Sequence, residues 1–401
     1  MTNAKDDDRP LAGMRVIEVG QLLAGPFAGT ILGYYGAEVI KVEPPPAGDP
    51  IRGWREVKNG TALWWASLAR NKKCVTLDLK SERGRELLRE LVATADVFIE
   101  NFRPGTMEEW SLGPEDLKAR NPGLIYTRIS GYGQTGPYAP RPGFASVCEA
   151  FGGFRYVNGF PGGPPVRPNL SIGDTLAGIH AAMGVLLAII SRQRDGEGQV
   201  VDVAIFEAIF NLLEGVIPEY DGAGVIRQPS GSTITGIVPS NTYRCKDDKL
   251  IVIGANTQSM FKRLTETMGQ PQMAEDPRFS DNAGRVEHQE EVDSTIEQWT
   301  LGLTSPDALD LLDQAGVAAG PIYDVKDMFA DPQFRARGLF EQVTIDGEPL
   351  NIPAIIPQLT RTPGRTDWPG EGVGTSNEAV FKDILGLASE DIDALRAEGV
   401  I

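Results

Sequence analysis

The sequence predicts an α/β protein whose first half forms a doubly wound parallel sheet and whose middle forms a smaller α+β domain. Three observations predict this. Apolar runs of strand length alternate with helical patterns up to about residue 206, as in βαβ units, which favour parallel strands with right-handed crossovers. A loop rich in Pro, Gly, Ser and Thr then interrupts the alternation at 229–241, and a hairpin pattern follows it. The 401 residues suffice for two or three domains with a sizeable core.

Each predicted element of the first half has a local signal. Pro26 and Gly36 bound one helix pattern, since Pro favours the first turn of a helix and Gly its end. Ser81 is the expected N-cap of an amphipathic helix over 81–95, and a long apolar helix runs from Asp174 to about Arg192. The apolar runs that predict strands are MRVIEVG (14–20), AEVIKVEP (37–44), CVTLDL (74–79), DVFIENF (96–102), GLIYTRISGYG (123–133) and VVDVAIF (200–206).

The character of the chain changes near residue 217. The segment 242–256, TYRCKDDKLIVIGAN, predicts a hairpin that turns at KDDK. Short strands and a helix over 389–399 close the chain. Between these two parts, three helical patterns are expected near 257–269, 285–300 and 305–315.

Charge and composition exclude several classes of partner. The chain has 38 Lys and Arg against 55 Asp and Glu, a net charge of −17, and its largest basic cluster is RNKK (70–73), so nucleic acid is not expected as a partner. The first ten residues, MTNAKDDDRP, predict a charged tail and no signal peptide. The longest apolar stretch, 175–190, is too short to span a bilayer. The three cysteines lack metal-ligand or CxxC spacing, so we expect a cytoplasmic protein with no metal site and no membrane contact.

Common catalytic motifs are absent from the sequence. No G-x-S-x-G elbow supports a serine hydrolase. The turn after the first strand, GQLLAGPFAG, lacks the G-x-G-x-x-G spacing of dinucleotide-binding folds, although a phosphate-bearing ligand at this helix start stays open. His180 lies within the apolar helix, and His288 lies on an expected charged helix face, so neither one predicts a metal centre.

Asp174 stands where the loop RPNLSIGD meets the long apolar helix, and two interpretations of it are open. Asp is a favoured N-cap, which stabilises a helix by about 0.5–2 kcal/mol. Ala177 stands three residues later, so no reciprocal capping box forms. Gly173 allows a ligand to approach, and the helix dipole keeps the carboxylate ionised. A desolvated carboxylate at this place could therefore attack an activated acyl group.

Three polar loops follow or precede predicted strands upstream of Asp174. They are RNKK (70–73), ENFRPG (100–105) and SGYGQTGPY (130–138), and any one of them could be an ordinary turn. Parallel sheets place ligands at the carboxyl ends of their strands. Asn101 and Arg103 could contact a nucleotide there, so the three loops together predict a binding crevice.

An ordered set of segments resembles the class III CoA-transferase family, the CaiB/BaiF type. The segments are LAGP (23–26), GAEVIKVEPP (36–45), RNKKCVTLDLKS (70–81), DVFIENFRPGTM (96–107), ISGYGQTGPY (129–138), IGDTLAG (172–178) and GQVVDVAIFEA (198–208), and the likeness extends to the terminal LRAEGVI (395–401). The resemblance implies an interlocked homodimer. Each chain would have a large Rossmann-like domain built from both termini (1–216 and 326–401) and a small domain with a linker (217–325). It also implies that Asp174 is the nucleophile that attacks an acyl-CoA thioester, with no cofactor besides coenzyme A.

The resemblance also maps CoA contacts onto this chain, with some departures. Formyl-CoA transferases carry Gln where this chain has Leu23, and they carry a glycine-rich flap that is missing here. A basic CoA contact is replaced by Pro44, and an arginine after NFxPG is replaced by acidic or aromatic residues such as Glu109. The implied CoA contacts are Leu23, Ala24, Lys41, Asn71, Lys72, Leu77 to Lys80, Asn101, Phe102, Arg103, Tyr132 and Gly133.

Within the family, the segments 141–174 and 236–249 look most like the branch that uses succinyl-CoA and small dicarboxylic acids such as malate, citramalate, mesaconate or itaconate. Arg52, Arg155 and Arg167 are candidates for holding the distal carboxylate of such an acid. A 2-methylacyl-CoA racemase is the alternative, but Phe144 holds the place of the histidine base that such enzymes need. A non-catalytic acyl-CoA-binding relative is a third possibility, which the presence of Asp174 does not favour.

Overall fold

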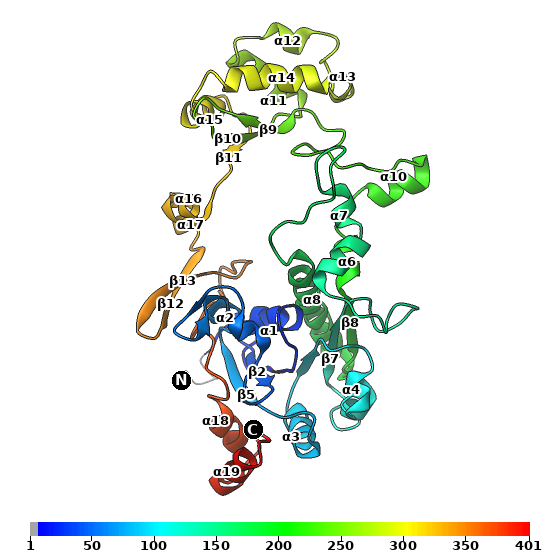
Figure 1. Cartoon of the computed structure of the whole chain (residues 1–401), viewed down its shortest axis with the longest axis vertical. Coiled ribbons are helices and arrows are strands. Elements are labelled where there is room, and N and C mark those ends of the chain that lie inside the picture. Colours follow the sequence, from blue (N-terminus) through cyan, green and yellow to red (C-terminus); the bar gives the residue numbers. More distant parts are fainter. Residues whose placement is uncertain (1–6) are drawn as a thin grey trace. The chain divides into compact units, whose positions relative to one another are not determined.

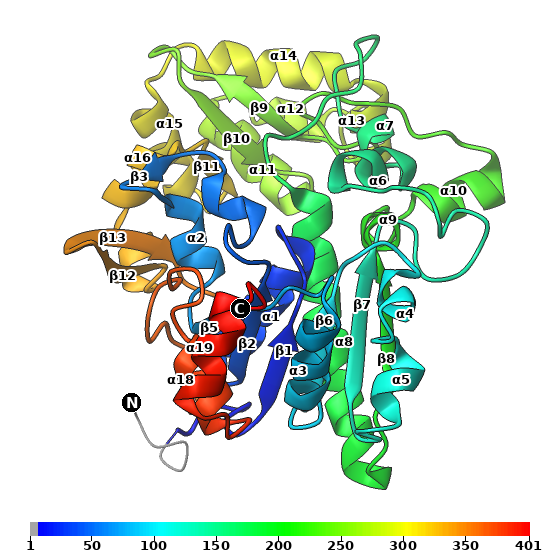
Figure 2. The same cartoon turned by 60° about the horizontal axis from the view of Figure 1, so that its bottom comes forward.

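The computed structural model describes residues 7–401, and its centre is a six-stranded parallel sheet (Figures 1 and 2). The strand order is β5-β2-β1-β6-β7-β8, which is the order of a doubly wound nucleotide-binding fold. The predicted fold class is therefore confirmed. The strands are β1 (Arg15–Glu18), β2 (Glu38–Glu43), β5 (Lys72–Thr76), β6 (Val97–Glu100), β7 (Ile125–Ser130) and β8 (Val200–Ala204).

The two faces of the sheet are both covered by helices, as alternate residues of each strand require. Val16 and Val39 pack in a core with α1 (Ala24–Tyr34) and α8 (Ile172–Asp195). Ile17 and Ile40 point the other way, into a core with α3 (Glu82–Val92), α18 (Asn377–Asp383) and α19 (Ser389–Ala397). Figure 2 shows the second set of helices in front of the sheet and α8 behind it. Ser81 caps α3 by accepting a hydrogen bond from the Gly84 N–H, as its sequence predicts.

The chain divides into two compact units, each described separately. The first comprises Met1–Phe154, Pro168–Glu214 and Gln333–Ile401, and the second comprises Arg155–Arg167 and Gly215–Pro332. The domain limits expected at residues 216 and 325 stay predictions. The remaining elements of the first unit are η1 (Pro50–Gly53), β3 (Val57–Lys58), β4 (Thr61–Ala62), α2 (Leu63–Leu68), α4 (Thr106–Glu109), α5 (Pro114–Lys118), α6 (Ala145–Phe151), α9 (Ile205–Phe210), β12 (Phe340–Ile345) and β13 (Glu348–Pro353).

The second unit has its own core beneath a three-stranded antiparallel sheet. The hairpin predicted around KDDK is confirmed as β9 (Ser240–Arg244) and β10 (Leu250–Gly254), with β11 (Ala319–Pro321) along β10 as an unpredicted strand. The helices of this unit are α10 (Val216–Ala223), α11 (Gln258–Thr267), α12 (Gln272–Glu275), α13 (Asn282–Glu287), α14 (Gln289–Thr300), α15 (Ser305–Gln314) and α16 (Val325–Ala330), while α7 (Phe154–Val157) and α17 (Pro332–Ala336) span the points where the chain passes between units.

Four local expectations are corrected by the structure. The long helix begins at Ile172 with Ser171 at the N-cap position, so Asp174 lies within the first turn and is not its cap. This helix has 24 residues and is long and apolar enough to cross a membrane by length and composition alone, unlike the 16-residue stretch that the sequence suggested. It packs against α1, β7 and β8. The helix expected over 285–300 breaks at His288, whose ring meets the edge of Phe279.

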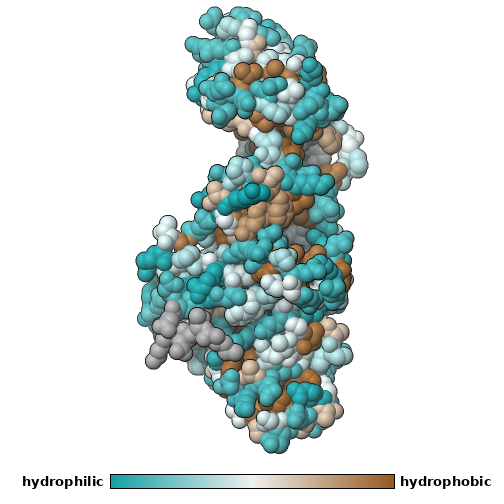
Figure 3. All heavy atoms as spheres, turned by 90° about the vertical axis from the view of Figure 1, so that its left-hand side faces the viewer, coloured by the Kyte–Doolittle hydropathy of each residue, from teal (hydrophilic) through white to brown (hydrophobic). Residues whose placement is uncertain are grey.

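The fourth correction concerns the expected N-terminal tail. Its first six residues lie outside the described part of the chain. Arg9, in contrast, is buried and pairs with Asp367 at 2.9 Å, so the chain is anchored from there on. Hydrophilic side chains cover most of the face shown in Figure 3, in keeping with the high charge content.

Candidate active site at the carboxyl end of the sheet

The strand order reverses between β1 and β6, and ligands of open α/β sheets bind beyond the carboxyl ends of the strands at such a point. The β1–α1 loop (residues 19–23) leaves β1 at this end of the sheet, and the loop from Asn101 leaves β6. The helix α8 runs antiparallel to the strands and ends just before β8, so its first turn lies at the same end. Of the three loops predicted from the sequence, 100–105 follows β6 and 130–138 follows β7, so both lie at this end with Asp174, whereas 70–73 leads into β5 at the opposite end.

Asp174 is held there by the packing of α8 on its neighbours. The Gly173 N–H donates to Glu149 Oε1 at 3.3 Å, and Glu149 on α6 is fully buried. Gly178 lies so close to α1 that an added Cβ would meet the Ala24 carbonyl oxygen at 2.9 Å and Phe27 at 3.1 Å. Asp174 is one helical turn earlier on the same face of α8, toward the β1–α1 loop.

The start of α1 offers backbone N–H groups to this carboxylate or to a ligand. No side chain caps α1 at Leu23, and the first turn of an α-helix has no intrahelical partners for its N–H groups. The N-termini of α1 and α8 are both sites of partial positive charge. Together they form an environment that favours anions without any bound metal.

Asn101 joins the two loops at the point where the strand order reverses. Its Oδ1 accepts from the Gln21 N–H at 2.7 Å, and its Nδ2 donates to the Gln21 carbonyl at 2.8 Å. Gly20 and Gly25 provide the space, since a Cβ on either would approach the Asn101 amide to between 3.0 and 3.4 Å. Asn101 therefore acts on the β1–α1 loop, a role that its sequence context did not reveal.

Two carboxylates act on Cys148 of α6, which lies near Asp174. Burial raises the pKa of the Cys148 thiol to about 12, and the charges of Asp174 and Glu149 add to this shift. The Cys148 Sγ donates to the Gly131 carbonyl at 3.3 Å, within the loop that follows β7. The thiol is thus protonated at neutral pH, and it is not itself a nucleophile.

An aromatic group beside this loop was missed by the sequence reasoning. The ring of Tyr132 lies 5.3 Å from that of Phe151 and 6.1 Å from those of Tyr138 and Phe206. The Arg141 guanidinium stacks 3.7 Å above the Tyr138 ring. These residues are separated by up to 74 positions, and the signal that could have found them is the aromatic content of the two segments 132–151 and 206–210.

Four of the predicted ligand contacts point into the protein. Lys41 and Lys72 are fully buried, and Asn71 donates to the Gly33 and Arg365 carbonyls. Arg52 binds Glu43 through two 2.7 Å hydrogen bonds and stacks on Trp65, so its guanidinium already has partners. Their assignment as direct ligand contacts is not supported by this geometry.

The other predicted contacts vary in exposure. Lys80 and Arg103 are exposed, as are Pro44 and Glu109, while Asn101, Phe102 and Tyr132 are half-buried. Leu23, Ala24, Leu77 and Gly133 are buried. Arg155 and Arg167 belong to the second unit. Phe144 is exposed at the N-cap position of α6.

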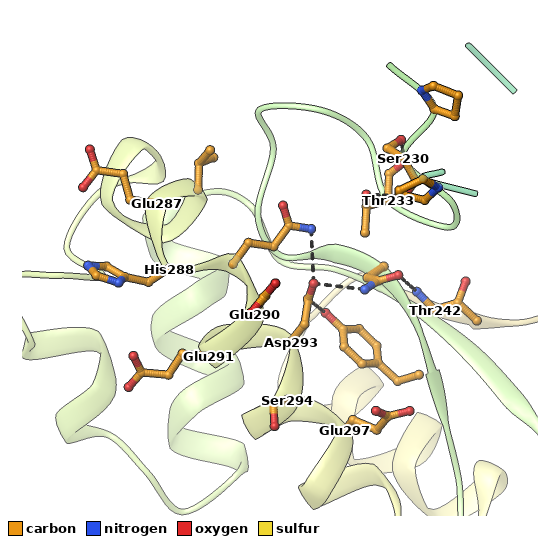
Figure 4. A pocket seen from close by; sticks show the side chains of 16 residues that line it. Ser230, Thr233, Thr242, Glu287, His288, Glu290, Glu291, Asp293, Ser294 and Glu297 are labelled. Atoms are coloured by element: carbon orange, nitrogen blue, oxygen red, sulfur yellow. Dashed lines mark hydrogen bonds between the residues drawn. The ribbon is translucent and has the colours of Figure 1, made fainter. Parts of the chain in front are cut away.

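The second unit contains a hollow of about 960 Å³ that does not suit an anionic ligand (Figure 4). Five of its lining residues are acidic, namely Glu287, Glu290, Glu291, Asp293 and Glu297, and its lining contains no Lys or Arg. Asp293 accepts hydrogen bonds from Tyr243, Asn241 and Gln289, so it organises the wall of the hollow. Such a surface repels CoA and dicarboxylates. Among residues 7–401, no cluster of three or more His, Cys, Asp or Glu side chains is arranged to hold a metal ion.

Comparisons with known proteins identify the family of this chain. The family model of CoA-transferase family III matches residues 11–375. The chain is 49% identical to a succinyl-CoA–D-citramalate CoA-transferase of Chloroflexus aurantiacus, over 98% of both chains. It is 42% identical to the alpha subunit of a succinyl-CoA–L-malate CoA-transferase of the same organism, over 98% of this chain and 92% of that one.

Solved structures give the same assignment. A CaiB/BaiF family protein from Brucella suis superposes with a TM-score of 0.82 at 34% identity, covering 94% of this chain and 99% of that one. A mutant of Rv3272 from Mycobacterium tuberculosis superposes with a TM-score of 0.85 at 30% identity, covering 96% and 100%. The family model, the relatives and the solved structures agree, and the chain belongs to CoA-transferase family III.

Proposed function

We propose that this enzyme transfers CoA from succinyl-CoA to a small dicarboxylic acid such as citramalate, malate, mesaconate or itaconate, with Asp174 as the nucleophile. The observation that carries the proposal is the position of Asp174 in the first turn of α8, on the helix face that packs against the uncapped start of α1 through Gly178. Family membership supports CoA transfer, and the names of the two relatives from Chloroflexus aurantiacus support the choice of substrates.

The reaction proceeds in two halves, each with balanced bonds. The Asp174 carboxylate attacks the thioester carbonyl of succinyl-CoA, and the C–S bond breaks. CoA departs as a thiolate, and a mixed anhydride between succinate and Asp174 is formed. The thiolate then attacks the aspartyl carbonyl, which releases succinate and leaves a thioester between CoA and Asp174. The carboxylate of the acceptor attacks this thioester and again expels the thiolate, which finally attacks the acceptor carbonyl and frees Asp174.

The site supplies what these steps need. A thiol has a pKa of about 8.5, so CoA leaves as a thiolate without a general acid. Each tetrahedral intermediate carries an oxyanion, and the free N–H groups at the start of α1 are suitable donors for it. The thioester bond energy is retained throughout, so the chemistry requires neither ATP nor a metal.

Recognition of the substrates remains part of the proposal. A dicarboxylate needs a cation for its distal carboxylate, and Arg52, Arg155 and Arg167 stay the proposed candidates. Of the predicted CoA contacts, Lys80, Arg103, Asn101, Phe102 and Tyr132 have accessible side-chain atoms. We also propose a cytoplasmic location.

We further propose that the protein acts as a homodimer. Five apolar side chains are exposed along α8 at helical spacing, and a second copy would cover them. They are Ile179, Met183, Leu186, Leu187 and Ile190. Leu187→Glu is expected to yield a monomer in analytical ultracentrifugation, and Glu197→Gln, on the exposed turn after α8, serves as a control that stays dimeric.

The test of the catalytic proposal is mass spectrometry of the products formed from succinyl-CoA and a panel of dicarboxylates. Asp174→Ala is expected to form no new CoA ester. Asp195→Ala removes an exposed carboxylate from the last residue of the same helix and is expected to behave as wild type. Transfer by Asp174→Ala would overturn the nucleophile. Exchange of the α-hydrogen of a 2-methylacyl-CoA with solvent deuterium, without transfer, would establish the racemase instead.

A further inference from the structure

A group of three buried charged residues lies beneath the β1–α1 loop. Glu18 of β1 contacts Lys41 of β2 at 3.2 Å and Lys72 of β5 at 2.8 Å, and all three side chains are fully buried. We call these residues the buried triad. Lys41 also pairs with the buried Asp49 at 2.9 Å. Sequence reasoning placed both lysines among the CoA contacts, whereas their ammonium groups are enclosed by protein atoms.

The buried triad holds the loop at both of its ends. Lys41 Nζ donates to the Gly20 carbonyl at 2.6 Å, where the chain leaves β1. Lys72 Nζ donates to the Pro26 carbonyl at 2.6 Å, in the first turn of α1. Between these points, Asp49 accepts from the Leu22 N–H at 3.1 Å. Leu22 has a φ of 64°, in the left-handed region that a leucine rarely adopts, so the loop needs such an anchor.

The helix α1 packs closely against the buried triad. A Cβ on Gly29 of α1 would lie 1.9 Å from Glu18 Oε2, so only glycine leaves room for this carboxylate against the helix. Glycine in a helix interior is unfavourable relative to alanine. The close approach of Glu18 explains why it stands there.

Stability alone does not account for this arrangement. Burying three charges costs desolvation free energy, and replacing such groups by apolar side chains of similar size is often neutral or stabilising. Burial lowers the pKa of Lys72 against the attraction of Glu18. Burial acts in the same direction on Lys41, but Asp49, Glu18 and Glu43 outweigh it and raise its pKa, so Lys41 stays charged.

We propose that Glu18, Lys41 and Lys72 are positioning residues that hold the β1–α1 loop so that the start of α1 faces the thioester of the bound acyl-CoA beside Asp174. This inference rests on the proposed function. Under this proposal, Lys41 and Lys72 do not contact CoA directly. They act on the loop through their hydrogen bonds to the Gly20 and Pro26 carbonyls.

The test compares Glu18→Gln with Glu38→Gln in the full-length protein. Glu38 of β2 also lies between two bases, Arg15 of β1 and Lys73 of β5, but it is 31% exposed and does not contact the loop. The measurements are the Kd of free CoA by titration calorimetry, KM and kcat for succinyl-CoA, and the temperature of unfolding. Because calorimetry needs no turnover, it reports on the loop even if no CoA transfer takes place.

We expect Glu18→Gln to weaken CoA binding and raise KM for succinyl-CoA by about tenfold or more, while KM for the acceptor acid stays within about twofold. Glu38→Gln is expected to match wild type in all three constants. Unchanged CoA binding in a folded Glu18→Gln protein would overturn the proposal, even if its unfolding temperature falls.

Two further variants cover the case in which Glu18→Gln does not fold. Gly29→Ala keeps every charge and displaces the Glu18 carboxylate, and Asp49→Asn keeps the shape of the anchor on Leu22 while removing its charge. Both are expected to weaken CoA binding as Glu18→Gln would, and normal CoA binding by both would overturn the proposal. Retained CoA transfer by Asp174→Ala would instead contradict the proposed nucleophile, so the two failures are distinguishable.

Discussion

The strands β1, β2 and β5 carry two groups, each of one acidic residue that contacts two basic residues. The groups differ in where they lie and in what else they contact. Glu18, Lys41 and Lys72 are fully buried on the α1 side, and their lysines hold backbone carbonyls of the β1–α1 loop. Arg15, Glu38 and Lys73 lie on the other face of the strands, with Arg15 and Glu38 at the amino ends of β1 and β2, and are 27–38% exposed. The two groups therefore have different roles. Only the buried group contacts backbone carbonyls of the loop, so only this group can hold the loop in position.

The amino end of the sheet contains further charges, and these fasten elements together. Arg192 near the end of α8 pairs with Asp96 at 2.9 Å, and Asp96 also accepts from the Arg15 N–H. The helix α8 therefore extends from a structural ion pair at one end of the sheet to Asp174 at the other. This contrast predicts that substitutions of the residues that hold the β1–α1 loop change activity, whereas those of the ion pairs at the amino end of the sheet change stability.

The largest effect is expected for Asn101→Ala, which removes both hydrogen bonds to Gln21. Loss of loop position should lower kcat/KM for succinyl-CoA by about 10²-fold. Steady-state kinetics checks this. Asn121→Ala is the matched control, because Asn121 also donates to two backbone carbonyls, those of Val92 and Ala95, at the amino end. Equal kinetic losses in both variants would remove the distinction between the two ends.

A smaller effect concerns the pH dependence of stability at Glu100, the last residue of β6. Burial raises the pKa of Glu100 to about 7, although Arg128 and the Phe102 N–H favour its charged form. The folded state therefore binds this proton more tightly than the unfolded state. The contribution of Glu100 to stability is present below about pH 4.5 and is lost as pH rises through about 7, by about 3 kcal/mol.

Denaturant unfolding of wild type and Glu100→Gln between pH 4.5 and 8 measures this contribution. Glu38 is the opposite case, because Lys73 and Arg15 outweigh its burial and lower its pKa. Its contribution is present above the unfolded pKa and is lost as pH falls through the folded pKa. A Glu100→Gln difference that grows more favourable to wild type with rising pH would contradict the assignment.

The smallest effect is expected for Glu38→Gln at neutral pH. Exposed ion pairs contribute little, so the free energy of unfolding should fall by about 1 kcal/mol, with kcat unchanged. Chemical denaturation and steady-state assays check both quantities. A loss of kcat without loss of stability would show that the amino end also acts on the site.

Local patterns predicted most of the fold. The runs of Val and Ile in β1, β2, β6 and β7 mark buried parallel strands, Ser81 marks the start of α3, and KDDK marks the β9–β10 turn. Short helices such as α2 and α9 were not predicted, because one or two turns carry too little periodicity. Ser171 begins α8 without a side-chain hydrogen bond, so the true start of that helix gave no local signal.

The site was predictable only in part. Asp174 and Asn101 were singled out from their places beside a helix and a strand. Their surroundings follow from tertiary packing, which spacing does not reveal: Glu149 accepts from the Gly173 N–H beside Asp174, and Asn101 binds Gln21. Lys41 and Lys72 were expected to reach a ligand because the family resemblance maps CoA contacts onto them. Their partner Glu18 lies on another strand, so no local pattern reveals the pairing.

The most direct test of the central claim is to trap the thioester on Asp174. Wild-type protein is incubated with succinyl-CoA without an acceptor, quenched in acid and digested, and the peptide containing Asp174 is examined by mass spectrometry. We predict that this peptide gains the mass of CoA less one water, and that Asp174→Ala yields no such adduct. CoA transfer that proceeds while the adduct is absent, or an adduct on another residue, would contradict the account.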